Sequence, residues 1–254
     1  MISALLEENP YGAAVLSAGQ LQTAGVSVSE FSQWLQTGLP QLASFKLCWL
    51  TLNAHETAFI RPALEAGFHY HHVQETTLTL VKRLQPDAYL PLAATHSVGV
   101  GAAVFNTQGQ ILLVQEIPLP GKKPGYFKLP GGMVETKEHF VAALEREVLE
   151  ETGVTATFQG WFAMRHHHQG QFGASNLYIV ARLFSEQTHV APDYTEIAAA
   201  GWFDPQQYLL DAKAHPYNKL LVQAALNSPL WQAGELPDYQ AGPLGFELFQ
   251  GRSK

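Results

Sequence analysis

Four glutamates and one arginine stand at fixed intervals within residues 132–154. They are Glu138, Arg146, Glu147, Glu150 and Glu151. Only 15% of the chain is charged, so this concentration of acid is a local feature. Carboxylates at close range repel one another unless a cation or a proton compensates their charge. Hard divalent ions such as Mg²⁺ prefer oxygen ligands and bind phosphates as further ligands. The spacing therefore indicates metal-assisted chemistry on a phosphate compound.

A helix over residues 140–151 would bring three of these acids onto one face. The segment contains no Gly or Pro, and Gly153 follows it as a stop signal. At about 100° per residue, Glu147, Glu150 and Glu151 share roughly a third of the helix circumference. A solvated acidic face is the ordinary alternative for a bare acid cluster. Gly132, Glu138, Arg146 and Gly153 all stand in register with these acids, and this longer pattern favours a metal site over that alternative.

Composition narrows the class of protein. The chain has 254 residues, 46% of them hydrophobic, which allows one large domain or two modest ones. The net charge of −7 argues against a basic nucleic-acid-binding surface. The single cysteine, Cys48, cannot form an internal disulfide, and we expect a buried thiol. We recognise no signal peptide or membrane span and expect a cytoplasmic protein that binds neither nucleic acid nor membrane.

The pattern of apolar and turn residues divides the chain into three parts. We predict a small α/β domain at 1–93, a larger domain at 94–233 and a C-terminal tail at 234–254. The first domain should run α-β-α-β-β, with a short helix around Phe31 and Trp34. Its other predicted elements are strands at 45–52, 68–72 and 76–84 and a helix at 55–66. In the larger domain, beyond the acidic helix, we predict strands at 97–105, 110–115, 154–162, 175–184 and 200–203 and a helix at 217–227.

The acidic segment also resembles a known family signature. Its residues read Gly132-x5-Glu138-x7-Arg146-Glu147-Val148-x-Glu150-Glu151-x-Gly153-Val154. This pattern matches the Nudix box at every fixed position, and the resemblance covers about residues 95–230. It implies an α+β protein: a Nudix α/β/α sandwich with a mixed sheet, preceded by a small acetyltransferase-like α/β domain. It also implies hydrolysis of nucleoside diphosphates linked to another moiety.

Three further segments resemble one Nudix subgroup that carries an N-terminal pre-Nudix domain. They are residues 66–72, 94–101 and 165–178. The subgroup includes the Nudix protein encoded antisense to basic fibroblast growth factor and plant ADP-ribose/NADH diphosphatases. The resemblance therefore implies ADP-ribose or NADH as substrate and a homodimer as the assembly.

The resemblance assigns roles residue by residue. The backbone carbonyl of Gly132 and the carboxylates of Glu147 and Glu151 would bind Mg²⁺ or Mn²⁺. Glu150 would be a ligand or a partner of bound water. Arg146 would hold these carboxylates in place, and it can reach Glu150 one turn further along. Glu138 would support the ligands without binding the metal itself. Glu196 could be a distal ligand, the general base, or a cap before a strand, so the base stays open between Glu196 and the acids of the box.

Substrate contacts are assigned more loosely. Arg165 could contact phosphate, and Phe172 and Tyr126 could stack on a base. Residues 166–168 are three consecutive histidines, but neighbours in extended chain point to opposite sides. We therefore expect a substrate-facing loop there in preference to a zinc site.

Two classes of function remain open from the sequence. The leading hypothesis is a Mg²⁺-dependent hydrolase in which water attacks a phosphorus of the pyrophosphate. The alternative is a nucleotide-sensing module that binds a partner without significant turnover. Acetyl transfer by residues 1–93 is disfavoured, since that segment has no Q/R-x-x-G-x-G/A run to bind a coenzyme A pyrophosphate.

Overall fold

The computed structural model describes residues 2–17, 19–118, 120–123, 125–237, 239 and 242–251. The chain divides into two compact units, Met1–Ala94 and Thr95–Lys254. Within the described ranges, no helix is both long and apolar enough to cross a membrane.

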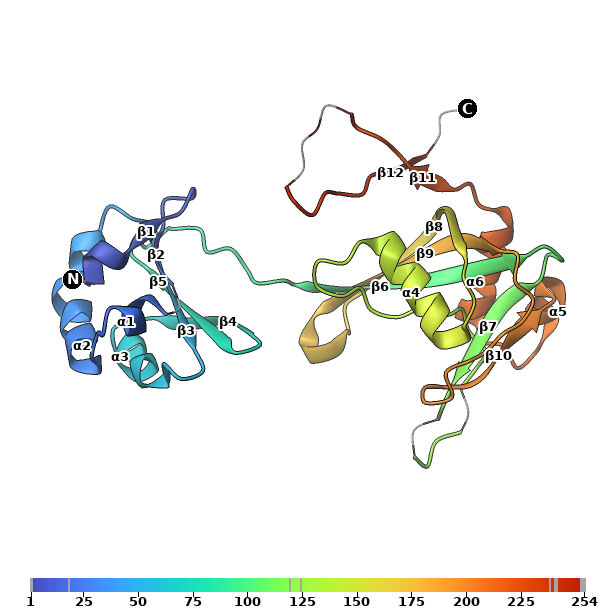
Figure 1. Cartoon of the computed structure of the whole chain (residues 1–254), viewed down its shortest axis with the longest axis horizontal. Coiled ribbons are helices and arrows are strands. Elements are labelled where there is room, and N and C mark those ends of the chain that lie inside the picture. Colours follow the sequence, from blue (N-terminus) through green and yellow to red (C-terminus); the bar gives the residue numbers. More distant parts are fainter. Residues whose placement is uncertain are drawn as a thin grey trace. The chain divides into compact units, whose positions relative to one another are not determined.

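The first unit is a five-stranded mixed sheet with helices on one face (Figure 1). Its strands are β1 (Glu7–Glu8), β2 (Ala14–Leu16), β3 (Leu47–Asn53), β4 (His69–Gln74) and β5 (Thr77–Arg83). They lie in the order β1-β2-β3-β5-β4, and only the β2–β3 pair is parallel. The helices are α1 (Gln20–Thr23), α2 (Val28–Thr37) and α3 (Ile60–Glu65). Short 3-10 turns at Ile2–Leu5, Leu39–Leu42 and Thr57–Phe59 complete the unit.

Local signals explain α2 and the turn before α3. Ser27 and Glu30 form a capping box at the start of α2, in which each reaches the other's backbone N–H. In the turn before α3, the Glu56 carboxylate accepts a hydrogen bond from the Asn53 amide at 2.8 Å. The predicted order of α2, β3, α3, β4 and β5 is confirmed, and β1, β2 and α1 are additions that the sequence patterns did not indicate.

The second unit contains a seven-stranded mixed sheet. Its strands are β6 (His96–Asn106), β7 (Ile111–Glu116), β8 (Thr157–His167), β9 (Ser175–Ser185), β10 (Ile197–Phe203), β11 (Trp231–Ala233) and β12 (Phe249–Gly251). The order is β10-β7-β6-β9-β8-β11-β12, and the central β6–β9 pair is parallel. The helices are α4 (Phe140–Thr152), α5 (Pro205–Leu210) and α6 (Pro216–Asn227), with a 3-10 turn at Gln171–Gly173.

Strand β6 is buried on both faces and separates two apolar layers. Val100, Ala102 and Val104 pack on the side of α4, whereas Ala103 packs on the side of α6. This period of two follows from the alternation of side chains along a strand. Figure 1 shows α4 and α6 on opposite sides of the sheet. The predicted α/β/α sandwich with a mixed sheet is confirmed.

The end of the chain differs from the predicted tail. Strand β11 pairs with β8 through Trp231 and Trp161, and β12 pairs with β11. Residues 249–251 therefore extend the main sheet, so the prediction of a tail from residue 234 onward was wrong for them. Three-residue strands carry too little periodicity to be recognised in a sequence. The parts of the predicted tail at 238, 240, 241 and 252–254 lie outside the described residues.

Candidate active site

Helix α4 carries the acidic residues, and its apolar side fixes its orientation on the sheet. Ala143, Leu144 and Val148 are fully buried against the strands. Gly153 ends the helix in the left-handed conformation, at φ 67°, and its amide donates to the Leu149 carbonyl at 2.8 Å. The helix spans Phe140–Thr152, one residue longer than predicted. Glu138 precedes it, in the loop that leads from Gly132.

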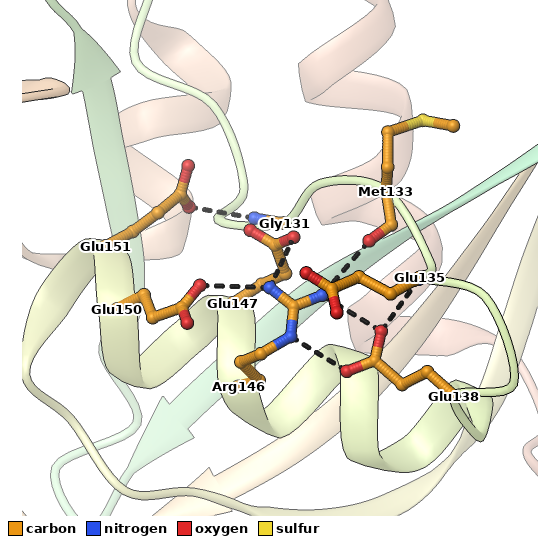
Figure 2. Close-up of polar contacts among 8 residues, drawn as sticks. All are labelled: Gly131, Met133, Glu135, Glu138, Arg146, Glu147, Glu150 and Glu151. Atoms are coloured by element: carbon orange, nitrogen blue, oxygen red, sulfur yellow. Dashed lines mark hydrogen bonds and ion pairs between the residues drawn. The ribbon is translucent and has the colours of Figure 1, made fainter. Parts of the chain in front are cut away.

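Arg146 is the centre of an ion-pair network (Figure 2). Its guanidinium donates to both oxygens of Glu138, at 2.8 and 3.0 Å, and to the Met133 carbonyl at 3.1 Å. It also donates to Glu147 at 3.0 Å and to Glu150 at 2.9 Å. The predicted contact with Glu150 is therefore present. The hydrogen bonds between the Arg146 and Glu138 side chains lower the pKa of Glu138. The same bonds are the main reason why the pKa of Arg146 is raised.

Glu151 stands apart from this network. It is 9% exposed, and its Oε2 accepts a hydrogen bond from the Gly131 amide at 2.9 Å (Figure 2). Burial raises its pKa to about 7, which the Gly131 bond and the charge of Lys128 partly oppose. Lys128 forms an ion pair with Glu116 at the end of β7. The sequence analysis missed Lys128 and Glu116, since neither belongs to the box and only the fold brings them near Glu151.

Gly132 meets the carboxylate of Glu147 at close range. A Cβ added at Gly132 would stand 2.5 Å from Glu147 Oε1, so a larger residue there would displace this carboxylate. The Gly132 carbonyl accepts a hydrogen bond from the Val100 amide at 2.8 Å. Gly131 has φ +142°, and an added Cβ would lie 2.1 Å from the Val100 carbonyl oxygen. The two glycines thus let the loop pass between β6 and the acidic helix.

The predicted metal ligands are near one another, but they are not arranged as a closed metal cage. Within the described part of the chain, no set of three or more His, Cys, Asp or Glu side chains is placed to hold an ion. The Arg146 guanidinium is bound to both Glu147 and Glu150. Even so, Glu147, Glu150 and Glu151 each use only one carboxylate oxygen for hydrogen bonds within the described residues. The other oxygen of each could bind a cation. Burial also raises the pKa of Glu147. This oxygen-only set, in which Glu147 and Glu151 are largely buried and Glu150 is exposed, fits a hard divalent cation.

Glu196 lies outside this network. It is exposed in the turn before β10, and its backbone carbonyl accepts a hydrogen bond from the Ile117 amide at 2.8 Å. Among the described residues, no hydrogen bond or ion pair joins its side chain to α4. Its role as a base or distal ligand therefore stays a prediction.

Arg165 is held by two tyrosines that the sequence analysis did not single out. Its guanidinium carbon lies 5.4 Å from the ring centre of Tyr178 and 5.2 Å from that of Tyr217. The Tyr178 hydroxyl lies over Gly101, where an added Cβ would stand 2.1 Å from it. Burial raises the pKa of Tyr178, and the charges of nearby residues, including Glu151, add to this. The Tyr178 side chain therefore lies against both Arg165 and Gly101 of β6.

The two predicted stacking residues lie elsewhere in the unit. Tyr126 packs against His215 at 5.2 Å between ring centres, beside a cavity of about 590 Å³ that Phe203 and Tyr208 also line. Phe172 is fully exposed in the turn after β8, with φ 54°. The structure therefore brings neither ring to Arg165, and their stacking on a base stays a prediction.

The histidine run forms a cluster of a different kind from the one expected. His166 and His168 lie on the same side of the chain, with ring centres 4.3 Å apart. His96 joins them from β6, and its Nε2 is 2.9 Å from Nε2 of His166. Residues 166 and 167 belong to β8 and not to a loop, so the loop prediction was wrong for them. His96 was missed because it lies 70 residues away in the sequence.

Comparison with known proteins gives the same family for both units. The NUDIX domain matches residues 95–224, and a Nudix hydrolase domain matches residues 6–84. Nudix hydrolase 8 of Arabidopsis thaliana is 30% identical over 209 residues, which cover 80% of this chain and 55% of that protein. Nudix hydrolase 2 of the same plant is 34% identical over 184 residues, covering 71% of this chain and 66% of that protein.

An animal relative extends the same result. Nucleoside diphosphate-linked moiety X motif 6 of Mus musculus is 33% identical over 186 residues, which cover 71% of this chain and 58% of that protein. The chain thus spans between about half and two thirds of the length of these relatives. The NUDIX domain alone accounts for half of the chain, and it contains the complete acidic pattern on α4. The chain belongs to the Nudix hydrolase family.

Proposed function

We propose that this protein hydrolyses the pyrophosphate bond of a nucleoside diphosphate linked to another moiety, in a reaction that depends on Mg²⁺. The observation that carries the proposal is the convergence of Glu147 and Glu151 with the Gly131–Gly132 loop, which lies against Val100 of β6. When bound, a divalent cation neutralises phosphate charge and activates water for attack on phosphorus. The residues that would hold it are Gly132, Glu147, Glu150 and Glu151.

The side chains of the protein would position the ligands and transfer the proton. Arg146 fixes the directions of Glu147 and Glu150 and is itself fixed by Glu138. Glu151, whose pKa is about 7 in the metal-free protein, can accept or release a proton near neutral pH when no cation is bound to it. Glu150 and Glu196 are the other candidates for the base.

For the substrate, we propose ADP-ribose or NADH. The support is the subgroup resemblance in residues 66–72, 94–101 and 165–178, together with relatives whose name specifies nucleoside diphosphate-linked moieties. Arg165, which stacks between Tyr178 and Tyr217, would bind a phosphate of such a compound. A homodimer belongs to the same proposal and rests on the same subgroup resemblance. A cytoplasmic location is proposed because the single buried thiol of Cys48 suits a reducing compartment.

The test is turnover by the purified full chain. A panel of nucleoside diphosphate derivatives, with ADP-ribose and NADH among them, is incubated with Mg²⁺ in ¹⁸O-labelled water. We expect two phosphate products from ADP-ribose, AMP and ribose 5-phosphate, with one ¹⁸O in one of them. We expect no product when EDTA removes the metal. Tight nucleotide binding without turnover of any panel member would contradict hydrolysis and support the sensing module instead.

Replacing Arg165 with Lys tests the substrate contact. Lysine keeps the charge but loses the planar donor group that stacks between the two rings. We expect KM for the diphosphate substrate to rise about tenfold, since roughly 1.4 kcal/mol of binding is lost, with a much smaller change in kcat. The control is Arg182→Lys on β9, where the side chain hydrogen-bonds only to Gln159 among the described residues. Equal KM values for both variants would remove Arg165 from the substrate site.

A further inference from the structure

The N-terminus of the acidic helix is capped by a residue from the far end of the chain. The Glu247 carboxylate accepts hydrogen bonds from the Phe140 amide at 2.6 Å and from the Val141 amide at 3.1 Å. Its side chain also lies 3.6 Å from Nδ1 of His139. Since Glu247 is 107 residues away from Phe140, this contact depends entirely on the fold of the C-terminal segment.

Helix α4 needs such a partner. The first amides of a helix have no acceptor within the helix, and they carry a partial positive charge. The residue before α4, His139, makes no side-chain cap of its own. A carboxylate that accepts from the first two amides supplies both the missing acceptors and a compensating negative charge. Glu247 therefore does from another segment what a Ser or Asp before the helix ordinarily does.

The segment that carries Glu247 is held in place by contacts both before and after this residue in the chain. After it, β12 pairs with β11, and the Phe249 ring packs 5.6 Å from Phe158 and 5.5 Å from Trp161 between ring centres. Before it, the Leu244 carbonyl lies 2.8 Å from Nε2 of His139. We call residues 244–251 the C-terminal clasp. It begins 20 residues after the match to the NUDIX domain ends at residue 224.

The capped turn is coupled to the acidic site through Glu138. Glu138 lies directly before His139, and its two oxygens hold Arg146. Arg146 in turn holds Glu147. A helix N-terminus that frays at Phe140 would release the backbone next to Glu138, and the carboxylates that Arg146 positions would lose their fixed directions. The cap thus stands at the start of a continuous set of contacts that ends at the proposed metal ligands.

From this geometry we propose that Glu247 is a positioning residue for the acidic helix, so that the C-terminal clasp is a part of the active site's support. The inference rests on the proposed metal-dependent function. It goes beyond that function because it gives a role to a residue outside the family match. Loss of the cap should weaken metal binding more than it slows the chemical step at saturating metal.

The experiment uses the full chain with Glu247→Ala and Glu247→Gln, and with Glu235→Gln as the control. Glu235 is an exposed acid in the same stretch of chain and makes no hydrogen bond or ion pair within the described residues. Binding of Mn²⁺ to the metal-free proteins is measured by electron paramagnetic resonance. Hydrogen exchange of the Phe140 and Val141 amides is followed by NMR or mass spectrometry. The Mg²⁺ concentration for half-maximal turnover and kcat are measured on the same samples.

For Glu247→Ala we expect about tenfold weaker Mn²⁺ binding, the size that loss of a supporting group produces. We also expect faster exchange in the first turn of α4 and a kcat within a few-fold of wild type at saturating Mg²⁺. Glu247→Gln keeps one acceptor oxygen and should fall between Ala and wild type, and Glu235→Gln should match wild type. Unchanged exchange, or unchanged Mn²⁺ affinity in a folded Ala variant, would overturn the inference.

The same data separate this inference from the proposed function. If the wild-type protein binds Mn²⁺ and hydrolyses the substrate but the Glu247 variants behave like it, only the positioning role fails. If the wild-type protein shows neither metal binding nor turnover, the proposed function fails, and the coupling of the cap to a metal site is overturned with it.

Discussion

Replacing Glu151 with Gln is expected to lower Mg²⁺-dependent turnover by more than about 100-fold, because loss of a direct ligand should exceed the 10–100-fold cost of losing a supporting group. The Gln side chain keeps the shape and an oxygen that can accept from the Gly131 amide, so the fold should survive. What it removes is the negative charge next to the Gly131–Gly132 loop. Initial rates at saturating substrate and Mg²⁺ measure the effect.

Added metal should reverse the order of stability of the Glu151→Gln variant and the wild-type protein. The pKa of Glu151 in the folded protein is about 7, compared with 4.5 for an ordinary glutamate. The folded state therefore holds its proton more tightly than the unfolded state, and the stability of the metal-free protein falls as pH rises from about 4.5 to 7. At pH 8 this difference amounts to roughly 3 kcal/mol. Metal-free Glu151→Gln should be more stable than wild type at pH 8, with the gap closing near pH 5.

Added Mg²⁺ should stabilise wild type and leave the Gln variant nearly unchanged, since an ion that binds only the folded state raises its stability. Thermal melts with Mg²⁺ and with EDTA measure both effects. The control is Glu145→Gln, which removes one charge from the same helix at a position that is not fixed in the box. A Glu151→Gln enzyme that turned over like wild type would refute the assignment of this residue.

Replacing Arg146 with Ala should give the largest loss of stability. The guanidinium is 26% exposed and bonds to three carboxylates and one carbonyl. Without it, Glu138 and Glu147, which are 16% and 15% exposed, would stay partly buried without a positive partner. Removing one member of a largely buried ion pair costs about 3 kcal/mol or more. Chemical denaturation at pH 7 measures the loss, and turnover should fall with it because Glu147 is no longer held.

The pH dependence of this loss identifies its cause. Arg146 lowers the pKa of Glu138 in the folded protein, so that the stabilisation is present above about pH 4.5 and is lost as pH falls through the folded value. The difference in the free energy of unfolding between wild type and Arg146→Ala should therefore become smaller below pH 4.5. Arg146→Lys keeps the charge but lacks the paired N–H donors of the guanidinium, so its stability should lie between those of the other two proteins. The control, Arg182→Ala, should cost much less, and an equal loss in both Ala variants would contradict a special role for Arg146.

The acidic helix could be predicted almost to the residue because its signals are local. Its apolar positions recur at helical spacing, and Gly153 marks its end within one turn. The contact between Arg146 and Glu150 follows from the same spacing, since residues four apart are neighbours on a helix. The central strands were also recognisable, because each is a run of apolar residues bounded by turn residues. These features need no knowledge of distant parts of the chain.

The side-chain contacts that were missed join distant segments. Glu247 meets Phe140, Tyr217 meets Arg165, and His96 meets His166 only after the sheet has formed. No spacing within a single stretch encodes such pairs. The family resemblance implied that Arg146 holds the acids of the box in place, and the spacing predicted its contact with Glu150, but its bond to Glu147 came only from the structure. A helical wheel shows which acids share a face, but it does not show that the arginine binds two of them at once.

The parallel pairing of β6 with β9 has a consequence for the folding of this protein during its synthesis on the ribosome. Ser97 pairs with Asn176, 79 residues later, so the middle of the sheet stays open until that distant partner has been made. At a synthesis rate of about 5–20 residues per second, the wait is roughly 4–16 s. During that time one edge of an apolar strand lacks its neighbour, and such edges promote aggregation. Nascent chains stalled before residue 175 should therefore depend on chaperones, however well their acidic helix has formed.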